Sequence, residues 1–240
     1  MIAAETTVRK IYPISTPMVN DWSELFTPGV EQHYRRGQVV FPRNHLHPYV
    51  YQVVKGLVAI CSVSQNDDVI LDAPGKGDLV NLDGILPAPN ESYRATALTG
   101  STILRRLPLT EVQVALQSRQ KWNEMVHQYL LNQIQRSQQR IHDLMVLSAP
   151  ERIIHFLMQY VLKQGRQVGF EWVVQPVLTH HEIGLLTGTG RQTVTTVLNE
   201  LRSEDVVHFT RNYFIIRNLE KMTTLSGCPV REEFRTANRK

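Results

Sequence analysis

The segment THHEIGLLTGTGRQTVTTVLNELRSEDVV, residues 179–207, contains two short helical patterns separated by a glycine-containing turn. In the first pattern, Thr179 stands three residues before Glu182, which is the spacing of a capping box at a helix N-terminus. In the second, apolar residues recur at i, i+3, i+4 and i+7, as on the buried face of a helix over residues 191–202. This face consists of Val194, Val197, Leu198 and Leu201. Two short helices around a turn at Gly188 predict a helix-turn-helix.

The other side of the second helix is polar. It carries Arg191, Gln192, Thr195, Thr196, Asn199 and Arg202. A helix of this kind fits the major groove of B-DNA, and its N-terminal residues reach the base edges. Arginine can bind guanine O6 and N7 together, glutamine can bind adenine N6 and N7, and a threonine methyl can pack on the thymine methyl. We therefore predict that bases are read by Arg191, Gln192, Thr195 and Thr196, although a solvated helix face would also tolerate these residues.

The segment after this helix predicts a two-stranded wing, because "VVHF" and "YFIIR" flank the turn "TRN". His208 and Arg211 of the wing are in position to contact phosphates, which orient a protein on DNA without reading sequence. The full set of predicted phosphate contacts is Thr179, His180, Thr193, His208 and Arg211.

Residues 32–109 have a different sequence pattern. Short apolar runs such as "YVYQVV", "LVAICSV" and "YRATAL" alternate with turn signals such as "PGKGD". Many short strands at this spacing predict an all-β barrel or jelly roll. Before them, a short helix is predicted around residues 20–26.

Pro108 precedes a stretch, residues 110–148, that contains neither proline nor glycine and is predicted to be one long helix. Its apolar positions follow a heptad spacing that indicates a coiled-coil seam. The seam residues are Leu130, Ile134, Ser137, Ile141 and Leu144. Because this stripe is narrow and long, we favour pairing with a second copy of the chain over packing of the stripe on the β domain.

Ala149-Pro150 ends the long helix, and a proline in the first turn suits a new helix over residues 151–163. The predicted fold class is α+β, with an N-terminal double-stranded β-helix (jelly roll), a long dimerisation helix and a C-terminal winged helix-turn-helix. The corresponding parts are residues 1–109, 110–148 and 149–225, followed by a polar tail over residues 226–240.

Composition sets limits on the class of protein. Hydrophobic residues make up 42% of the chain, which is enough for a packed core. The net charge of +4 is compatible with nucleic-acid binding but is too small to indicate it. The two cysteines cannot build a disulfide framework, and no apolar run approaches the roughly 18 residues that span a bilayer. These features predict a soluble cytoplasmic protein without a membrane partner.

The segment "LTHHEIGLLTGTGRQTVTTVLNEL" resembles the helix-turn-helix of the Crp/Fnr family of bacterial transcription regulators. The resemblance extends to "VVKGLVAI" and "PGKGDLVNLDGI" in the β region and to "ERIIHFL" after the long helix. It implies a homodimer that binds an inverted-repeat DNA site and carries an N-terminal sensor domain. RNA polymerase is a further implied partner.

Several positions depart from the family pattern. By resemblance, Arg191, Gln192 and Thr196 occupy the family's three base-reading positions. Gln192 replaces the usual glutamate and Thr196 replaces a frequent arginine, so a different half-site is expected. His180 stands where the family touches phosphate, and Gly190 replaces a serine or threonine.

The sensor domain departs further. Cyclic-nucleotide-binding members use a "GEL" glutamate for the ribose and an "RSA" arginine for the cyclic phosphate. These positions hold Leu82 and Tyr93 here, while Asp83 and Arg94 are shifted by one residue. A shift of one residue on a strand reverses the face to which a side chain points. We therefore predict that the protein does not bind cyclic AMP.

Two other effectors of the family also lack their residues, while haem ligation by one of the nine histidines stays open as an alternative to their more frequent structural role. Cys61 alone cannot hold an iron–sulfur cluster, and the helix arginine of a 2-oxoglutarate-sensing branch falls at Gln133. No cofactor is predicted, and the sequence does not identify an effector. The candidate effector pocket consists of Leu82, Asp83, Tyr93, Arg94, Gln133 and Ser137. Arg105 and Arg106 could hold an anionic effector, but as neighbours on a strand at most one of them points inward.

The alternative function is a cupin-like metal-dependent enzyme or a small-molecule-binding protein. His45 and His47 resemble part of a cupin metal motif, but the glutamate and the second histidine motif are missing, so no metal site and no enzyme activity are predicted. Cys61 lies in an apolar run and is expected to be a buried, inert thiol. Cys228 lies in the polar tail, and no role is assigned to it.

Overall fold

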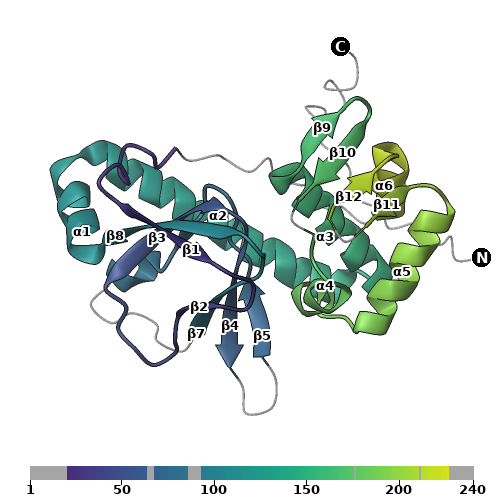
Figure 1. Ribbon diagram of the computed structural model, residues 1–240, viewed down its shortest axis with the longest axis horizontal. Coiled ribbons are helices and arrows are strands. Elements are labelled where there is room, and N and C mark those ends of the chain that lie inside the picture. Colours follow the sequence, from purple (N-terminus) through teal and green to yellow (C-terminus); the bar gives the residue numbers. More distant parts are fainter. Residues whose placement is uncertain (1–20, 64–67, 86–92, 176, 211, 227–240) are drawn as a thin grey trace, which may run out of the picture.

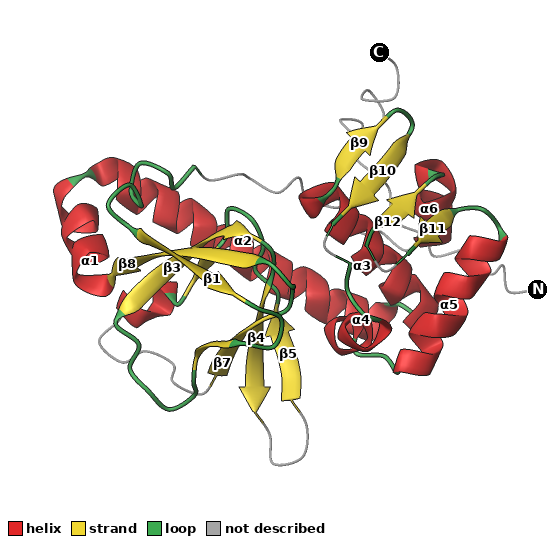
Figure 2. Cartoon of the chain, in the orientation of Figure 1, coloured by secondary structure: helices red, strands yellow, loops and turns green. Residues whose placement is uncertain are grey.

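A computed structural model describes residues 21–63, 68–85, 93–175, 177–210 and 212–226. The chain forms an N-terminal β part, a long helix beside it, and a C-terminal part in which helices surround a small sheet (Figure 1; Figure 2). The predicted α+β class and the order of its three parts are confirmed.

The N-terminal part is a roll of two antiparallel four-stranded sheets, with strand orders β1-β8-β3-β6 and β2-β7-β4-β5. The first contains β1 (Val30–Tyr34), β3 (Tyr49–Lys55), β6 (Leu79–Val80) and β8 (Thr102–Pro108). The second contains β2 (Val39–Phe41), β4 (Val58–Val63), β5 (Asp68–Asp72) and β7 (Tyr93–Ala97). Side chains from both sheets share one core, which includes Phe41, Tyr51, Val58, Ala95 and Leu104. This is the jelly-roll arrangement that the strand spacing predicts.

The predicted helix over residues 20–26 is wrong for the part that the structure describes. Residues 23–28 form a turn, with one helix-like hydrogen bond from the Phe26 N–H to the Trp22 carbonyl (3.0 Å). Trp22 and Phe26 are both fully buried. The turn therefore places two buried aromatic side chains beside the roll. Pro28 follows before a longer helix can form.

The single helix predicted over residues 110–148 is also wrong, because it is broken at Arg119. The structure has α1 (Leu109–Ser118) and α2 (Gln120–Val146), with extended backbone at Arg119 (φ −139°, ψ 115°). The break lets Val112 of α1 and Trp122 of α2 enter the same apolar core under the roll. Burial of both side chains thus outweighs the helix propensity of an uninterrupted sequence.

The two sides of α2 have different environments. Trp122, Val126 and Tyr129 are buried against the roll, and the Tyr129 hydroxyl donates a hydrogen bond to the Leu79 carbonyl (2.9 Å). The seam lies on the exposed side, where the exposed fractions are Leu130 43%, Ile134 54%, Ile141 57% and Leu144 48%, and Ser137 is also exposed. The seam therefore does not pack on the β domain within one chain. Although α2 is long, no helix of the described residues is apolar enough over its length to cross a membrane.

The C-terminal part begins with α3 (Ala149–Gln164), which starts in the capping box formed by Ser148 and Glu151. The elements that follow are β9 (Arg166–Val168), β10 (Glu171–Val174), α4 (His180–Thr187), α5 (Arg191–Ser203), β11 (Val207–Phe209), β12 (Phe214–Ile216) and α6 (Leu219–Ser226). Their sheet has the order β11-β12-β10-β9. The predicted two-stranded wing is present as the antiparallel pair β11 and β12.

A buried contact between His155 and Asp143 joins the long helix to the C-terminal part. His155 of α3 is 1% exposed, and its Nδ1 lies 2.6 Å from Oδ2 of Asp143 in α2. Asp143 also accepts a hydrogen bond from Gln139 through its other oxygen (2.7 Å). The last turn of α2 is therefore held against α3 on the far side of the break at residues 147–148.

Asp78, between β5 and β6, connects the roll to both neighbouring helices. Its Oδ2 accepts a hydrogen bond from the Gly75 N–H (2.8 Å), and its Oδ1 accepts one from Arg136 of α2 (3.2 Å). Lys163 of α3 also forms an ion pair with Asp78, which is 4% exposed. Because breaking a buried ion pair leaves an uncompensated charge, this junction resists separation of the three parts.

Asp72 lies near the same charged groups, but its ionised carboxylate destabilises the fold. Burial raises the pKa of Asp72, and the neighbouring Asp78 carboxylate raises it further. A carboxyl group whose pKa is raised by folding favours the protonated state. Its ionisation therefore lowers the free energy of unfolding as the pH rises from the unfolded-state pKa, about 3.9, through the folded-state pKa.

We expect Asp72→Asn to stabilise the protein at neutral pH, because asparagine keeps an acceptor for the Ala73 N–H without the buried charge. Thermal unfolding at pH 7 should show a rise in Tm of about 2–4 °C, the shift that about 1 kcal/mol produces in a chain of this size. The gain should shrink as the pH falls towards 4. The control is Asp205→Asn, since the Asp205 side chain is 75% exposed. A lower Tm for Asp72→Asn at pH 7 would mean that attraction to Lys163 and Arg136 outweighs burial.

Candidate functional site

The turn between α4 and α5 has the geometry that its sequence predicts. The Thr179 hydroxyl accepts a hydrogen bond from the Glu182 N–H (3.2 Å), and the Glu182 carboxylate accepts one from the Thr179 N–H (2.6 Å). Gly188 ends α4 with φ 63°, a conformation that favours glycine. At Gly184, an added Cβ would lie 2.8 Å from the Thr189 carbonyl oxygen, so the close approach of the turn to α4 requires a glycine.

The predicted base-reading residues form one surface on α5. Val194, Val197, Leu198 and Leu201 are buried beneath it, as the i, i+3, i+4, i+7 spacing predicts. A shallow, open depression on the outer side is lined by Arg191, Gln192, Thr195 and Thr196. Arg191, Gln192 and Thr196 are exposed. The structure thus brings together the four side chains to which base reading is assigned.

The hydroxyl groups of the two threonines point back to their own helix. Thr195 donates a hydrogen bond to the Arg191 carbonyl (3.0 Å), and Thr196 donates one to the Gln192 carbonyl (3.2 Å). Both hydroxyl protons are therefore engaged with α5. This arrangement disfavours donation of a hydrogen bond to a base, and it is compatible with apolar contact such as with a thymine methyl.

His180 of α4 contacts Thr195 of α5 and so connects the two helices. Its Nδ1 lies 2.8 Å from the Thr195 hydroxyl oxygen, and its ring meets Phe209 edge to face at 6.0 Å. Burial lowers the pKa of His180, and the neighbouring Arg191 lowers it further. Because the Thr195 hydroxyl donates to the Arg191 carbonyl, it accepts its second bond from His180 Nδ1–H. The neutral ring then presents Nε2 as an acceptor, which is unsuited to a phosphate oxygen.

The other predicted phosphate contacts differ in their exposure. Thr179 is exposed at the start of α4, while Thr193 in α5 and His208 in β11 are half-buried. The His208 ring lies 6.4 Å from that of Tyr213, which directly precedes β12. Arg211 lies outside the described residues, as do Cys228 and the tail beyond residue 226.

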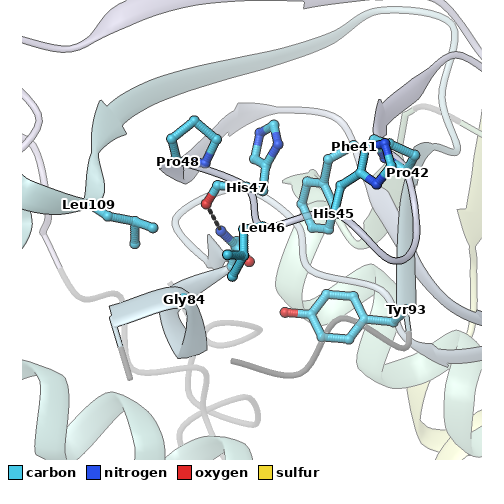
Figure 3. Close-up of a pocket in the computed structure, with 10 residues that line it drawn as sticks. Phe41, Pro42, His45, Leu46, His47, Pro48, Gly84, Tyr93 and Leu109 are labelled. Carbon is cyan, nitrogen blue, oxygen red and sulfur yellow. Dashed lines mark hydrogen bonds between the residues drawn. The ribbon is translucent and has the colours of Figure 1, made fainter. Parts of the chain in front are cut away.

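The roll contains a cavity of about 230 Å³ near the end of β2 (Figure 3). Its walls are Phe41, Pro42, His45, Leu46, His47, Pro48, Asn81, Gly84, Tyr93 and Leu109. Asn81 has a positive φ of 64° and donates hydrogen bonds to the carbonyls of His47 and Tyr49 (3.2 and 2.8 Å). These bonds stabilise a conformation that is uncommon outside glycine, and they fix the wall that contains His47.

The six residues predicted to form an effector pocket do not converge. Tyr93 lines the cavity, and its hydroxyl donates a hydrogen bond to Asp83 (2.5 Å). Leu82 is buried in the core under the roll, and Gln133 bonds instead to the Tyr129 hydroxyl (2.9 Å). Ser137 is exposed along the seam, and Arg94 does not line the cavity. The family pattern therefore placed Tyr93 at the cavity, but it did not indicate the walls formed by Phe41 and by residues 45–48.

The two neighbouring arginines of β8 point to opposite faces of the sheet, as their positions predict. Arg105 faces outward and pairs with Glu31 of β1 (2.5 Å). Arg106 is paired with Tyr51 across the sheet and lies over the Tyr49 ring at 4.4 Å, so it faces the inside of the roll.

The histidines of the cupin-like motif have separate contacts. His45 Nδ1 lies 2.5 Å from the Asn44 carbonyl oxygen, while His47 Nε2 contacts the Tyr51 hydroxyl. Across the ranges that the structure describes, no three His, Cys, Asp or Glu side chains gather as metal ligands would. Cys61 is buried in the apolar core, as expected.

Two family models match the chain, and together they span its roll and its C-terminal part. The cyclic nucleotide-binding domain matches residues 31–128, and the Crp-like helix-turn-helix domain matches residues 151–225. The chain belongs to the Crp/Fnr family of transcription regulators.

One relative is similar to the chain in sequence over most of its length, and two solved structures have a similar fold. The chain is 25% identical to a global nitrogen regulator of Synechocystis sp. over 201 residues, which cover 82% of this chain and 88% of the relative. FixK2 from Bradyrhizobium japonicum has a similar structure, with a TM-score of 0.74 at 19% identity over 84% of this chain and 99% of FixK2. A mutant of CooA from Carboxydothermus hydrogenoformans gives a TM-score of 0.67 at 20% identity, covering 86% of this chain and 92% of CooA.

Within this Crp/Fnr member, one further element was missed by the sequence analysis. Helix α6 packs on α3 through Leu219 and Met222, and the Asn218 side chain accepts a hydrogen bond from the Lys221 N–H (2.9 Å). Asn218 before an apolar pair spaced three apart was an available capping signal. The helix thus adds Leu219 and Met222 to the apolar core that also contains the buried face of α5.

Proposed function

We propose that this Crp/Fnr regulator binds an inverted-repeat DNA site as a homodimer and reads bases with α5. The observation that carries the proposal is the surface of Arg191, Gln192, Thr195 and Thr196, four polar side chains on the first turns of a helix whose other face is buried. The first turn of such a helix is the part that reaches deepest into a major groove.

The exposed seam of α2 supports the homodimer. Four large apolar side chains spaced as in a heptad repeat remain in water in the single chain, while the other side of the same helix packs on the roll. A second copy of α2 presents a matching stripe, and twofold pairing of identical stripes buries both. Twofold symmetry of the protein in turn requires an inverted repeat in its site, with half-site centres about one helical turn apart.

Selection of sites from a random duplex pool with the full chain tests this proposal. The expected result is a motif with inverted symmetry, bound with an affinity that falls steeply with salt because phosphate contacts release counterions. A motif without inverted symmetry would contradict the dimeric binding mode. RNA polymerase remains a predicted partner, to be tested by transcription from a promoter that carries the selected site.

The second candidate function, binding of a small molecule by the roll, is favoured by the cavity at Tyr93. Cyclic AMP is not expected to be its ligand. Leu82 is in the position of the ribose-binding carboxylate and is buried in the core, while Tyr93 replaces the phosphate-binding arginine and bonds to Asp83. A phosphate placed there would meet a carboxylate instead of a guanidinium.

Calorimetry with cyclic AMP should therefore give no binding heat at micromolar ligand. A cyclic-AMP-binding member of the same family, titrated under the same conditions, provides the positive control. Micromolar affinity, about −8 kcal/mol, would contradict this prediction and would require a different set of contacts for the nucleotide.

A further inference from the structure

A side chain of the roll reaches the start of the helix-turn-helix. Arg36 lies in the turn between β1 and β2, and its guanidinium extends to the segment that leads into α4. Its Nη2 donates a hydrogen bond to the Val177 carbonyl (2.9 Å), and its Nη1 lies 3.3 Å from Oε1 of Glu182. One guanidinium therefore contacts both the backbone before α4 and the first turn of α4 itself.

The turn that carries Arg36 is held on the roll by backbone hydrogen bonds. The Gly37 N–H donates to the Ala97 carbonyl of β7 (2.8 Å), and the Ala97 N–H donates to the Gln38 carbonyl (2.9 Å). Within the turn, the Gln38 N–H donates to the Arg35 carbonyl (3.0 Å). The contact at α4 thus starts from a backbone that the second sheet of the roll fixes in place.

The Glu182 carboxylate takes part in two contacts. It accepts a hydrogen bond from the Thr179 N–H in the capping box (2.6 Å), and it pairs with Arg36. The Glu182 side chain is only 13% exposed, while that of Arg36 is 40% exposed. Loss of Arg36 would leave a largely buried carboxylate without this cation, which costs free energy. The ion pair therefore favours the position of α4 in which Arg36 can reach it.

Apolar packing accompanies the ion pair, and the docked position leaves α5 open. Leu57 and Ile70 of the roll belong to the same apolar cluster as Ile183 of α4, and α4 lies beside β5. Helix α5 lies on the side of the C-terminal part that faces away from the roll (Figure 1), and the depression that begins at Arg191 is open. Docking of the C-terminal part on the roll is therefore compatible with DNA binding.

We propose that Arg36 is a positioning residue for DNA binding, which holds the C-terminal part on its own roll at the angle from which α5 enters the major groove. This inference rests on the proposed function, because it requires a dimer that reads an inverted repeat. Two copies of α5 must meet two half-sites at a fixed distance. A contact that fixes each C-terminal part beforehand reduces the ordering that binding would otherwise require. Arg36 acts through Glu182 and Val177, not through a contact with DNA.

Fluorescence anisotropy with the full chain and a duplex that carries the selected inverted repeat tests this role. Arg36→Gln should weaken binding at least fivefold and leave the slope of log affinity against log salt unchanged, whereas loss of a phosphate contact would lower that slope by about one unit. Arg36→Lys should lie between the two, because a single ammonium does not present the fork of a guanidinium to two acceptors. Arg35→Gln, the loss of an exposed guanidinium in the same turn, is the matched control and should change affinity at most twofold.

A change in half-site spacing distinguishes positioning from a general loss of stability. When two base pairs are inserted between the half-sites, the wild-type protein should lose affinity strongly, because its two copies of α5 are held at one distance. In Arg36→Gln this loss should be at least threefold smaller, since a C-terminal part that is released from the roll can adapt. An equal loss in both proteins would contradict the positioning role.

Glu182→Gln isolates the ion pair, because glutamine keeps an acceptor for the Thr179 N–H in the capping box. In this background, Arg36→Gln should weaken binding at most twofold. Equal weakening in both backgrounds, or a lower salt slope, would show that Arg36 acts on DNA directly and would overturn the proposal. Unchanged or tighter binding by Arg36→Gln in the wild-type background would overturn it as well. Absence of binding by the wild-type protein would instead contradict the proposed function.

Discussion

Ile134→Glu and Ile141→Glu are each expected to convert the protein to a monomer and to abolish binding to an inverted repeat. The two side chains are 54% and 57% exposed in the single chain and lie on the proposed seam. In a twofold pair, each glutamate would face its symmetry mate in an apolar contact. An unpaired buried charge costs about 3–5 kcal/mol, so the dimer dissociation constant should rise at least about a hundredfold.

Sedimentation equilibrium measures this change, and Val114→Glu is the matched control. Val114 on α1 is 63% exposed and lies outside the seam, so the same kind of substitution there should leave the dimer intact. Unchanged dimers for both seam variants would refute the assignment. Dissociation with Val114→Glu as well would instead indicate general damage to the fold.

Arg191→Ala is expected to remove the preference for one guanine in each half-site. Arg191 is exposed at the first position of α5, and a bidentate arginine–guanine contact contributes about 1–3 kcal/mol of discrimination. Gln192→Glu should move the neighbouring preference from adenine towards cytosine, because a carboxylate only accepts hydrogen bonds and cytosine N4 donates one. Site selection with each variant gives the result directly.

Arg211→Ala in the wing provides the contrasting variant for this experiment. Loss of a phosphate contact should weaken all sequences alike and reduce the slope of log affinity against log salt by about one unit. A selected motif that is unchanged by Arg191→Ala would show that α5 is not the reader. Loss of sequence preference in Arg211→Ala would show that the wing reads bases as well.

The sequence predicted the parts of the candidate site that depend on local patterns. The capping box at Thr179, the turn at Gly188 and the polar side of α5 each depend on residues within about one turn of helix, and the structure has each of them. Local patterns also separated Arg105 from Arg106, since the two faces of a strand alternate.

What the sequence did not predict depends on contacts between distant segments. The break at Arg119 exists because Val112 and Trp122 share a core with residues of the roll. The cavity combines β2, the loop over residues 45–48 and Tyr93, so no single run of sequence contains it. Gln133 was assigned to the pocket by its family position, and neither Gln133 nor Ser137 lines the cavity.

The carboxylate of Asp78 has a consequence for the logic of regulation. It forms ion pairs with both Arg136 on α2 and Lys163 on α3, the first helix of the C-terminal part. In the dimer that we propose, a shift at this junction would change the distance and angle between the two copies of α5, while the side chains on each α5 would keep their arrangement. Coupling through this junction would therefore change the preferred spacing of the two half-sites, but not the preferred bases within each half-site. In such a dimer, the groups at the junction and the side chains on α5 are different residues, so one set could change in evolution without altering the other.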